Sequence, residues 1–310
     1  DVYKRQMIHG IINVYKEKGF TSHDVVAKLR GIVGQKKIGH TGTLDPDAEG
    51  VLPVCLGRAT KLCDLLTDKD KVYETVLLLG TVTDTQDVSG EILERRDTSS
   101  VTEAMLREKI SSFEGGYAQI PPMYSALKVG GKKLYELARE GKSVERKPRN
   151  IKIYNIDILK VELPRVKMRV HCSKGTYIRT LCHDIGESLG CGGCMEELLR
   201  TQVSRFQLEN AYTLSQIEES KEKGKLEDLI LPIDEMFSEY PKAVVMDRWK
   251  KLIYNGNPFP DRAVLDKLDV SDEEPVRVYD QEEHFIGLYR YRAAKKDYTI
   301  MKMFFDQESL

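Results

Sequence analysis

Apolar side chains recur every three or four positions in several segments of the chain, which is the period of a helix with one buried face. Residues 22–33 show this spacing, and the serine at position 22 is suited to cap the helix. Residues 100–113 show it again, behind a Ser-x-x-Glu capping box. A third helix is predicted at 178–189, followed by a glycine, so that Tyr177 and Arg179 lie at its first turn.

Other segments have the short alternating or continuous apolar runs that are typical of β-strands. The predicted strands are 71–80, 166–172, 276–279, 284–291 and 298–305, and residues 51–56 form a short apolar run that we expect to be buried. The last three strands lie close together in the chain, which favours a small barrel. An acidic, loosely helical segment at 214–239 precedes them. The pattern therefore predicts a large α+β domain at 7–239 and a small C-terminal domain at 240–310.

The composition fits a globular protein without a membrane span. The 310 residues are 41% hydrophobic and 31% charged, with a net charge of −1, and no apolar run approaches the ~20 residues that cross a bilayer. Residues 1–6 have no signal-peptide pattern, and we expect them to be a non-native leader before Met7. We therefore expect a cytoplasmic protein with reduced cysteines. Cys191 and Cys194 form one CxxC without the further ligands of a zinc site, so no metal is predicted.

One stretch is strongly basic although the net charge is close to zero. Between residues 128 and 152, nine lysines and arginines stand against three glutamates. A solvated charged surface explains this bias, and an insertion that binds RNA phosphates explains it equally well. Pro121 and Pro122 exclude regular structure just before the stretch. We predict an RNA-gripping insertion at about 118–150.

A loop at residues 39–50 is dense in glycine, threonine, aspartate and proline, and it carries Asp45 directly before Pro46. This composition alone is compatible with a surface turn. The chain has no G-x-S-x-G turn, no phosphate-binding loop and no glycine-rich dinucleotide turn. What remains is carboxylate chemistry centred on Asp45, which requires a nearby cation to stay ionised.

Five motifs, in one order, resemble those of the TruB-type tRNA pseudouridine synthases, which modify uridine 55 in the T-loop. They are Gly39-His-Thr-Gly-Thr-Leu-Asp-Pro with Gly57-Arg-Ala-Thr-Lys, Lys71-Val-Tyr, Thr83-Asp-Thr with Asp87, Ile120-Pro-Pro-Met-Tyr-Ser-Ala-Leu-Lys, and Cys172-Ser-Lys-Gly-Thr-Tyr-Ile-Arg-Thr. The resemblance is strong over residues 8–210. It implies the α+β fold of that family, with a central mixed, mostly antiparallel sheet flanked by helices and a C-terminal PUA-like RNA-binding β-barrel.

The resemblance also implies roles for individual residues. Asp45 would be the catalytic nucleophile, Arg179 would pair with it and keep it ionised, and Tyr73 would stack on or hydrogen-bond the target uracil. The alternative for Arg179 is an ordinary surface arginine, and the alternative for Tyr73 is a tyrosine buried in the strand core. The implied substrate-binding residues are His40 in place of the flipped base, Tyr177 and Leu199 at the pocket, and the basic residues Lys18, Lys61, Lys132 and Lys133.

The implied reaction detaches uracil from its ribose, turns it and rejoins it through C5, so it requires no metal and no cofactor. The carboxylate attacks either C1′ of the ribose or C6 of the ring, and the sequence does not separate these routes. The implied partner is the T-arm stem-loop of tRNA, and we expect a monomer with no obligate protein partner. The alternatives are a non-catalytic tRNA chaperone on the same scaffold and an enzyme of the same fold that acts on ribosomal RNA within a ribonucleoprotein.

Overall fold

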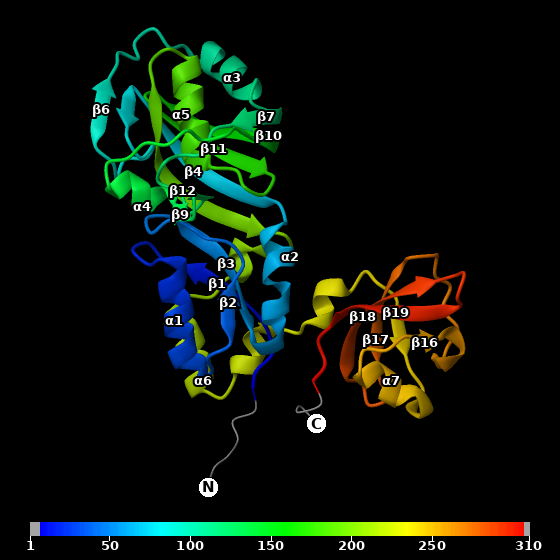
Figure 1. The fold of residues 1–310 in the computed structure, drawn as a ribbon. Helices are drawn as coiled ribbons and strands as arrows, with labels where there is room; N and C mark the ends of the chain where they lie inside the picture. Colours follow the sequence, from blue (N-terminus) through cyan, green and yellow to red (C-terminus); the bar gives the residue numbers. More distant parts are fainter. Residues whose placement is uncertain (1–6, 307–310) are drawn as a thin grey trace.

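A ten-stranded sheet forms the centre of the computed structural model, which describes residues 7–306 (Figure 1). Its main path runs β14-β1-β3-β12-β4-β11-β10-β7, with β2 on β3 and β13 on β12. The strands are antiparallel to their neighbours except for β12 and β3, which are parallel. They are β1 Gly10–Lys16, β2 Ile38–His40, β3 Glu49–Leu56, β4 Lys71–Leu79, β7 Gly115–Gln119, β10 Arg149–Glu162, β11 Arg165–Cys172, β12 Gly193–Val203, β13 Phe206–Gln207 and β14 Ile230–Leu231. The predicted leader at 1–6 lies outside the described residues.

Helices pack on this sheet in two groups (Figure 1). α1 (Ser22–Val33) and α6 (Leu214–Glu222) share one hydrophobic core with β1 and β3. α3 (Glu103–Ser111) and α5 (Ile178–Ser188) share another with β4, β10 and β11. The shorter helices are α2 Cys63–Thr67, α4 Leu134–Arg139 and α7 Lys250–Tyr254. The site described below lies where the two groups meet.

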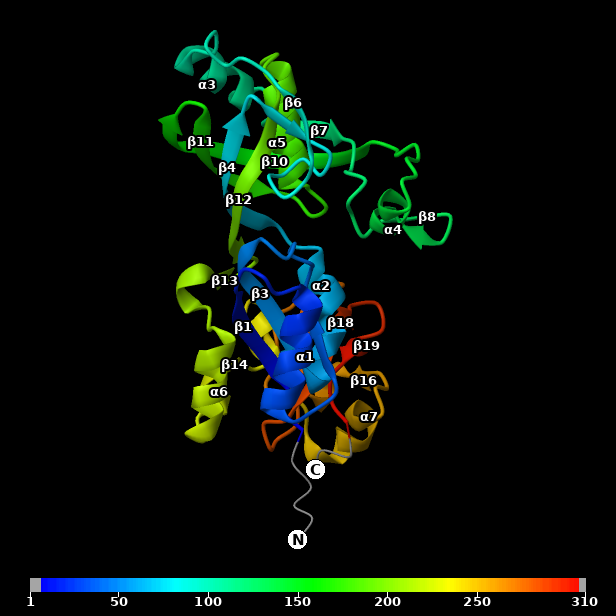
Figure 2. The ribbon, with the colours of Figure 1, turned by 90° about the vertical axis from the view of Figure 1, so that its left-hand side faces the viewer.

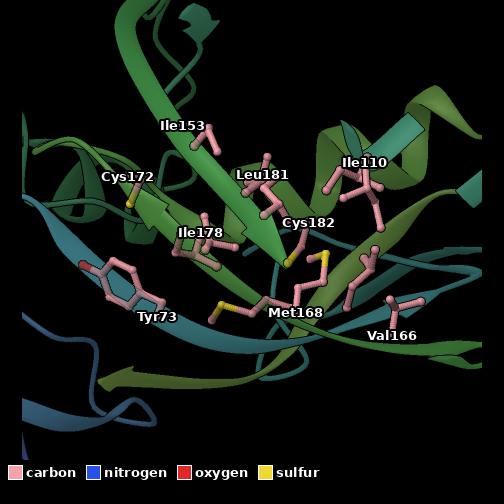
Figure 3. Packing of buried hydrophobic residues seen from close by; sticks show 14 of the residues in the cluster. Tyr73, Ile110, Ile153, Val166, Met168, Cys172, Ile178, Leu181 and Cys182 are labelled. Carbon is pink, nitrogen blue, oxygen red and sulfur yellow. The ribbon is translucent and has the colours of Figure 1, made fainter. Parts of the chain in front are cut away.

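The alternation of side chains along β4 determines which residues face the α5 core. Tyr73 and Leu77 are buried on that face, whereas Glu74 points to the other face and pairs with Lys167 and Arg169 of β11. Figure 3 shows the Tyr73 ring beside this core with its hydroxyl pointing away from Met168. The aromatic ring thus anchors the strand while its polar end remains available to the site.

A second sheet of five strands, in the order β15-β17-β18-β19-β16, forms the C-terminal part, where the predicted barrel is present as a curled half-barrel. The strands are β15 Lys242–Val244, β16 Phe259–Pro260, β17 Pro275–Tyr279, β18 Phe285–Arg292 and β19 Asp297–Met303. It has its own core and also shares one with the large sheet, because Leu288 and Phe304 pack with Ile11 and Val51. The two sheets are therefore joined by apolar packing as well as by the chain.

An arm, residues 120–148, leaves the large sheet between β7 and β10 (Figure 2). It holds two short strands, β8 (Lys128–Val129) and β9 (Lys132–Lys133), followed by α4. Figure 2 shows the arm projecting from the body beyond β7. A separate short hairpin consists of β5 (Thr81–Thr83) and β6 (Ile92–Arg95).

Several predictions of secondary structure are confirmed, and others are wrong in detail. The helix at 22–33 has the predicted bounds, but Thr21 rather than Ser22 caps it, in a capping box with Asp24. Thr102, not Ser100, caps α3. No helix between residues 7 and 306 is long and apolar enough to cross a bilayer.

Candidate active site

Asp45 lies in the loop of residues 41–48, which joins β2 to β3. Buried hydrogen bonds hold this loop in place: the Leu44 N–H donates to Ser22 Oγ at 2.9 Å, and Thr41 Oγ1 donates to the Pro53 carbonyl at 2.9 Å. Because these contacts tie the loop to both α1 and β3, the Asp45 backbone has a defined position rather than that of a surface turn.

The Arg179 guanidinium contacts the Asp45 carboxylate, with Nε 3.0 Å from Oδ2. The Arg179 side chain is 7% exposed and Asp45 is 41% exposed, so the pair lies at the edge of solvent. The remaining nitrogens of Arg179 donate to the carbonyls of Thr85 at 3.3 Å and Tyr124 at 2.8 Å. Asp87 lies 3.7 Å from the same guanidinium. Arg179 is thus held by backbone groups from two other loops, which fixes the direction in which it meets Asp45.

Two opposing effects act on the ionisation of Asp45. Burial raises the pKa of the Asp45 carboxyl, and the Arg179 guanidinium opposes this by lowering the pKa. Lys16 lies below the loop, fully buried, and its ammonium donates to the carbonyls of Phe20 at 2.6 Å and Pro46 at 3.2 Å. Burial lowers the pKa of Lys16 to about 8. The carboxylate thus depends on nearby cations to stay ionised in a partly desolvated position.

Cross-strand pairing places Arg200 and Leu198 of β12 on the Tyr73 face of the sheet. Arg200 is directly opposite Tyr73, and Leu198 is opposite Thr75. Leu198 packs against the core that includes Tyr73. Leu199, which the sequence indicated as a pocket residue, is opposite Glu74 on the other face.

A β-bulge in β12 between Met195 and Glu197 explains why Leu198 rather than Leu199 faces Tyr73. The bulge adds one residue to the strand, so the alternation of side chains after it is shifted by one position. Leu199 lines a depression of about 240 Å³, whose lining also includes Leu198 and Glu74. Lys18 lines the same depression together with carboxylates such as Asp47 and Glu49. The structure therefore does not bring Leu199 or Lys18 to Asp45.

Tyr177 and His40 lie on two different elements, Tyr177 at the start of α5 and His40 at the end of β2, just before the Asp45 loop. Tyr177 precedes α5, and its backbone N–H and carbonyl both bond to the Gln119 side chain, at 2.8 and 3.0 Å. His40 ends β2, its Nδ1 accepts the Gly42 N–H at 3.3 Å, and its ring meets that of His23 edge-on. Burial lowers the pKa of His40, which favours the neutral imidazole.

The other predicted basic residues lie away from Asp45. Lys61 donates to the Met303 carbonyl at 2.7 Å, so it joins the Gly57–Leu62 helical turn to the second sheet. Lys132 and Lys133 lie on the arm, where Lys132 pairs with Glu140 and Lys133 lies over the Tyr135 ring. These three lysines do not belong to the group around Asp45.

Sequence reasoning missed several residues of the site. Lys16 lies two residues after Val14 and four after Ile12, so in a strand it faces the same buried side as they do. This alternation could have identified Lys16 as a buried lysine. Gln119 ends β7, and Asp87 belongs to one of the five motifs but was given no role there; no local pattern identifies the partners of either residue. The sequence alone could not show that Gln119 would bond to the start of α5.

One cluster between residues 7 and 306 has the side chains to ligate a metal: Asp280, Glu282 and His284. Asp280 already accepts hydrogen bonds from the Tyr254 hydroxyl and the His284 backbone N–H, at 2.6 and 2.8 Å, and the Lys250 ammonium lies 3.8 Å away. The cluster is thus satisfied by groups of the protein itself, and it lies in the second sheet, apart from Asp45.

Family models match most of the chain. The model of the TruB family pseudouridylate synthase N-terminal domain matches residues 30–178, and that of the tRNA pseudouridylate synthase B C-terminal domain matches 179–238. A tRNA pseudouridine synthase B of Lachnoclostridium phytofermentans is 58% identical over 96% of this chain and 100% of its own. The chain belongs to the TruB family of pseudouridylate synthases. It is therefore a pseudouridine synthase, which is an isomerase.

Other comparisons agree with this assignment. The tRNA pseudouridine synthase B of Clostridium tetani is 45% identical over 96% of this chain and 99% of its own. Among solved structures, a Cbf5–Nop10–Gar1 complex contains a chain that is 27% identical, with a TM-score of 0.70 over 96% of this chain and 86% of that one. The predicted pseudouridine-synthase fold is therefore confirmed.

Proposed function

We propose that this TruB family member isomerises uridine 55 in the T-loop of tRNA to pseudouridine, with Asp45 as the nucleophile. The observation that carries the proposal is the contact between Asp45 and Arg179 at the edge of solvent, on the sheet face that also bears Tyr73. The names of the relatives, which are tRNA pseudouridine synthases, support tRNA as the substrate.

In this proposal the target uridine leaves its stack, because the glycosidic bond is shielded inside a folded T-loop. Tyr73 offers an aromatic surface with a hydroxyl at its edge, and Leu198 replaces Leu199 as the apolar wall, because only Leu198 packs on the Tyr73 side. His40, neutral and half-buried, is suited to fill the vacated place in the RNA stack. Tyr177 lines the other side of the same pocket.

We further propose two RNA-binding parts beyond the site. The arm carries basic residues on a projecting segment (Figure 2). Its base is tied to the site because Arg179 donates a hydrogen bond to the Tyr124 carbonyl. The C-terminal unit, residues 240–310, would act as a PUA-like RNA-binding domain beside the catalytic unit at 7–239. We propose that the protein acts on free tRNA as a monomer.

The test is tritium release from a T-arm hairpin that carries 5-tritiated uridine at position 55. We expect release with the hairpin alone and no release when a cytidine replaces uridine 55 and the label is placed elsewhere in the loop. Tight binding of the hairpin without release would favour the tRNA chaperone. Release that required a guide RNA would favour the ribonucleoprotein enzyme.

A further inference from the structure

Arg200 is the largest side chain that is fully buried in the described chain, at 1% exposed. Its Nε donates to the Val51 carbonyl at 2.7 Å, and one Nη donates to the Gly42 carbonyl at 3.3 Å. Gly42 lies near the start of the Asp45 loop, and Val51 lies in β3, which follows the loop. Arg200 therefore fastens β12 to the loop and to the strand after it.

The environment of Arg200 differs from that of Arg179. Arg179 meets the carboxylates of Asp45 and Asp87. Between residues 7 and 306 no carboxylate forms an ion pair with Arg200, although its guanidinium is removed from solvent. A buried cation without an anion is costly. Lys71 is buried in the same way, so what distinguishes Arg200 is its position directly opposite Tyr73.

Tyr73 is the cross-strand neighbour of Arg200. The two residues are directly opposite each other on β4 and β12, and the guanidinium is close enough to the Tyr73 hydroxyl to lower the pKa of that hydroxyl, against the effect of burial. A guanidinium has five N–H donors and no acceptor, so toward Arg200 the Tyr73 oxygen can act only as an acceptor, which leaves the hydroxyl proton free to point elsewhere. Figure 3 shows that the hydroxyl lies at the end of the ring that points away from Cys182 and the core around it.

The proposed reaction places an electron pair on the uracil ring by either route. Attack of the carboxylate on C1′ forms a C–O bond and breaks the glycosidic bond, whose electron pair remains on N1. Attack on C6 forms a C–O bond, and the pair of the C5–C6 double bond moves into the ring enolate. A hydrogen-bond donor held toward the ring is stabilising in both cases.

We propose that Arg200 is a positioning residue: it orients the Tyr73 hydroxyl so that this hydroxyl donates a hydrogen bond to the negatively charged uracil ring. This inference rests on the proposed function. Arg200 itself does not touch the substrate, because it is buried beneath the Asp45 loop. Its effect passes through the Tyr73 oxygen, which distinguishes this role from that of a purely structural buried arginine.

The test is a double-mutant cycle of Arg200→Met and Tyr73→Phe, measured as single-turnover tritium release at saturating T-arm RNA. We expect Arg200→Met to slow the step by about 10²-fold in the wild-type background, as for the loss of an oriented donor. In the Tyr73→Phe background, Arg200→Met should slow the single-turnover step by less than about threefold, because the hydroxyl is already absent. Arg200→Lys keeps a charged donor, so its single-turnover rate should be at least about tenfold higher than that of Arg200→Met. RNA affinity should change less than about threefold.

Lys71→Met is the matched control. Lys71 is another buried cation, 7% exposed, that donates only to backbone carbonyls, those of Thr67 and Lys69. Its replacement should lower the melting temperature without slowing the single-turnover step. If Arg200→Met does not fold, the cycle is run with Arg200→Lys, whose smaller defect should vanish in the Tyr73→Phe background.

An equal slowing by the Arg200 change in both backgrounds would overturn the inference and leave the proposed function intact. The same conclusion follows if Arg200→Met and Lys71→Met have equal effects on the rate. Failure of the proposed function is separate, because it would show as no tritium release by the wild-type protein itself.

Discussion

Replacing Arg179 by methionine should reduce the single-turnover rate and make it depend more steeply on pH. Arg179 Nε lies 3.0 Å from the Asp45 carboxylate, and Coulomb's law at an effective dielectric constant of about 20 gives about 5.5 kcal/mol for unit charges at this separation. Because Asp45 is 41% exposed, solvent screening reduces this to roughly 1–3 kcal/mol. That corresponds to a factor of about 10 to 10² in rate.

Loss of orientation adds to this electrostatic loss. Arg179→Met also frees the carbonyls of Thr85 and Tyr124, so the loops around Asp45 lose their common partner. A misplacement of about 1 Å at a reacting group costs about 10²-fold in rate. The expected total is therefore a slowing of about 10³- to 10⁴-fold near neutral pH.

The direction of the pH effect follows from the two opposing influences on Asp45. Burial raises the pKa of Asp45 and Arg179 lowers it, so removal of Arg179 leaves the pKa higher. At a given pH less of the carboxyl is then ionised, and part of the lost rate should return as the pH rises. Single-turnover tritium release between about pH 5.5 and 9 measures this directly.

Arg169→Met is the control, because Arg169 also pairs with a carboxylate, Glu74 at 2.9 Å, but on the other face of the sheet. It should leave both rate and pH profile unchanged. The reasoning is refuted if Arg179→Met keeps a rate near that of the wild type, or if its profile has the same shape and midpoint as that of the wild type.

Three further changes test other parts of the structure. Leu198→Ala should lower the single-turnover rate or RNA affinity by roughly tenfold, whereas Leu199→Ala should stay within about twofold of wild type; the reverse order would contradict the assigned face. Gly50→Ala places a Cβ 2.2 Å from the Arg200 carbonyl oxygen, whereas Gly115, which also has positive φ, has no atom within 4 Å. Urea unfolding should therefore show Gly50→Ala to be less stable than Gly115→Ala by about 1–3 kcal/mol, and equal stabilities would refute the clash. Neutralising Lys132, Lys133 and Lys142 of the arm together should weaken tRNA binding and make the affinity depend less on salt concentration. An unchanged salt dependence would mean that these lysines are merely solvated.

Periodicity predicted the regular, half-buried elements well. The helix at 22–33 and the strand at 166–172 have unbroken patterns of apolar residues, because each packs one face against a single core. It missed β10 (Arg149–Glu162), which has register irregularities near Ile153 and Ile158. Each irregularity shifts by one residue the positions whose side chains face the core, so apolar and polar residues no longer alternate along the whole strand.

The candidate site depended on knowledge that no local pattern contains. Asp45 and Arg179 are far apart in the chain, and their juxtaposition was expected only because the motifs resemble a known family. Leu199, which differs from expectation, lies where one position along the backbone decides the face, because the bulge in β12 turns Leu198 toward Tyr73. A motif identifies the segment, but the face follows from a bulge or turn that only the three-dimensional structure shows.

The most direct test of the central claim is single-turnover tritium release by the Asp45→Asn variant on the T-arm hairpin, with Asp47→Asn as the matched control. Asn keeps the shape of the side chain but removes the nucleophilic charge, so we predict no release above background with RNA affinity within about threefold of wild type. Asp47, two residues away, lines the depression that Leu199 also lines and should be dispensable. Measurable turnover by Asp45→Asn would contradict the assignment of the nucleophile.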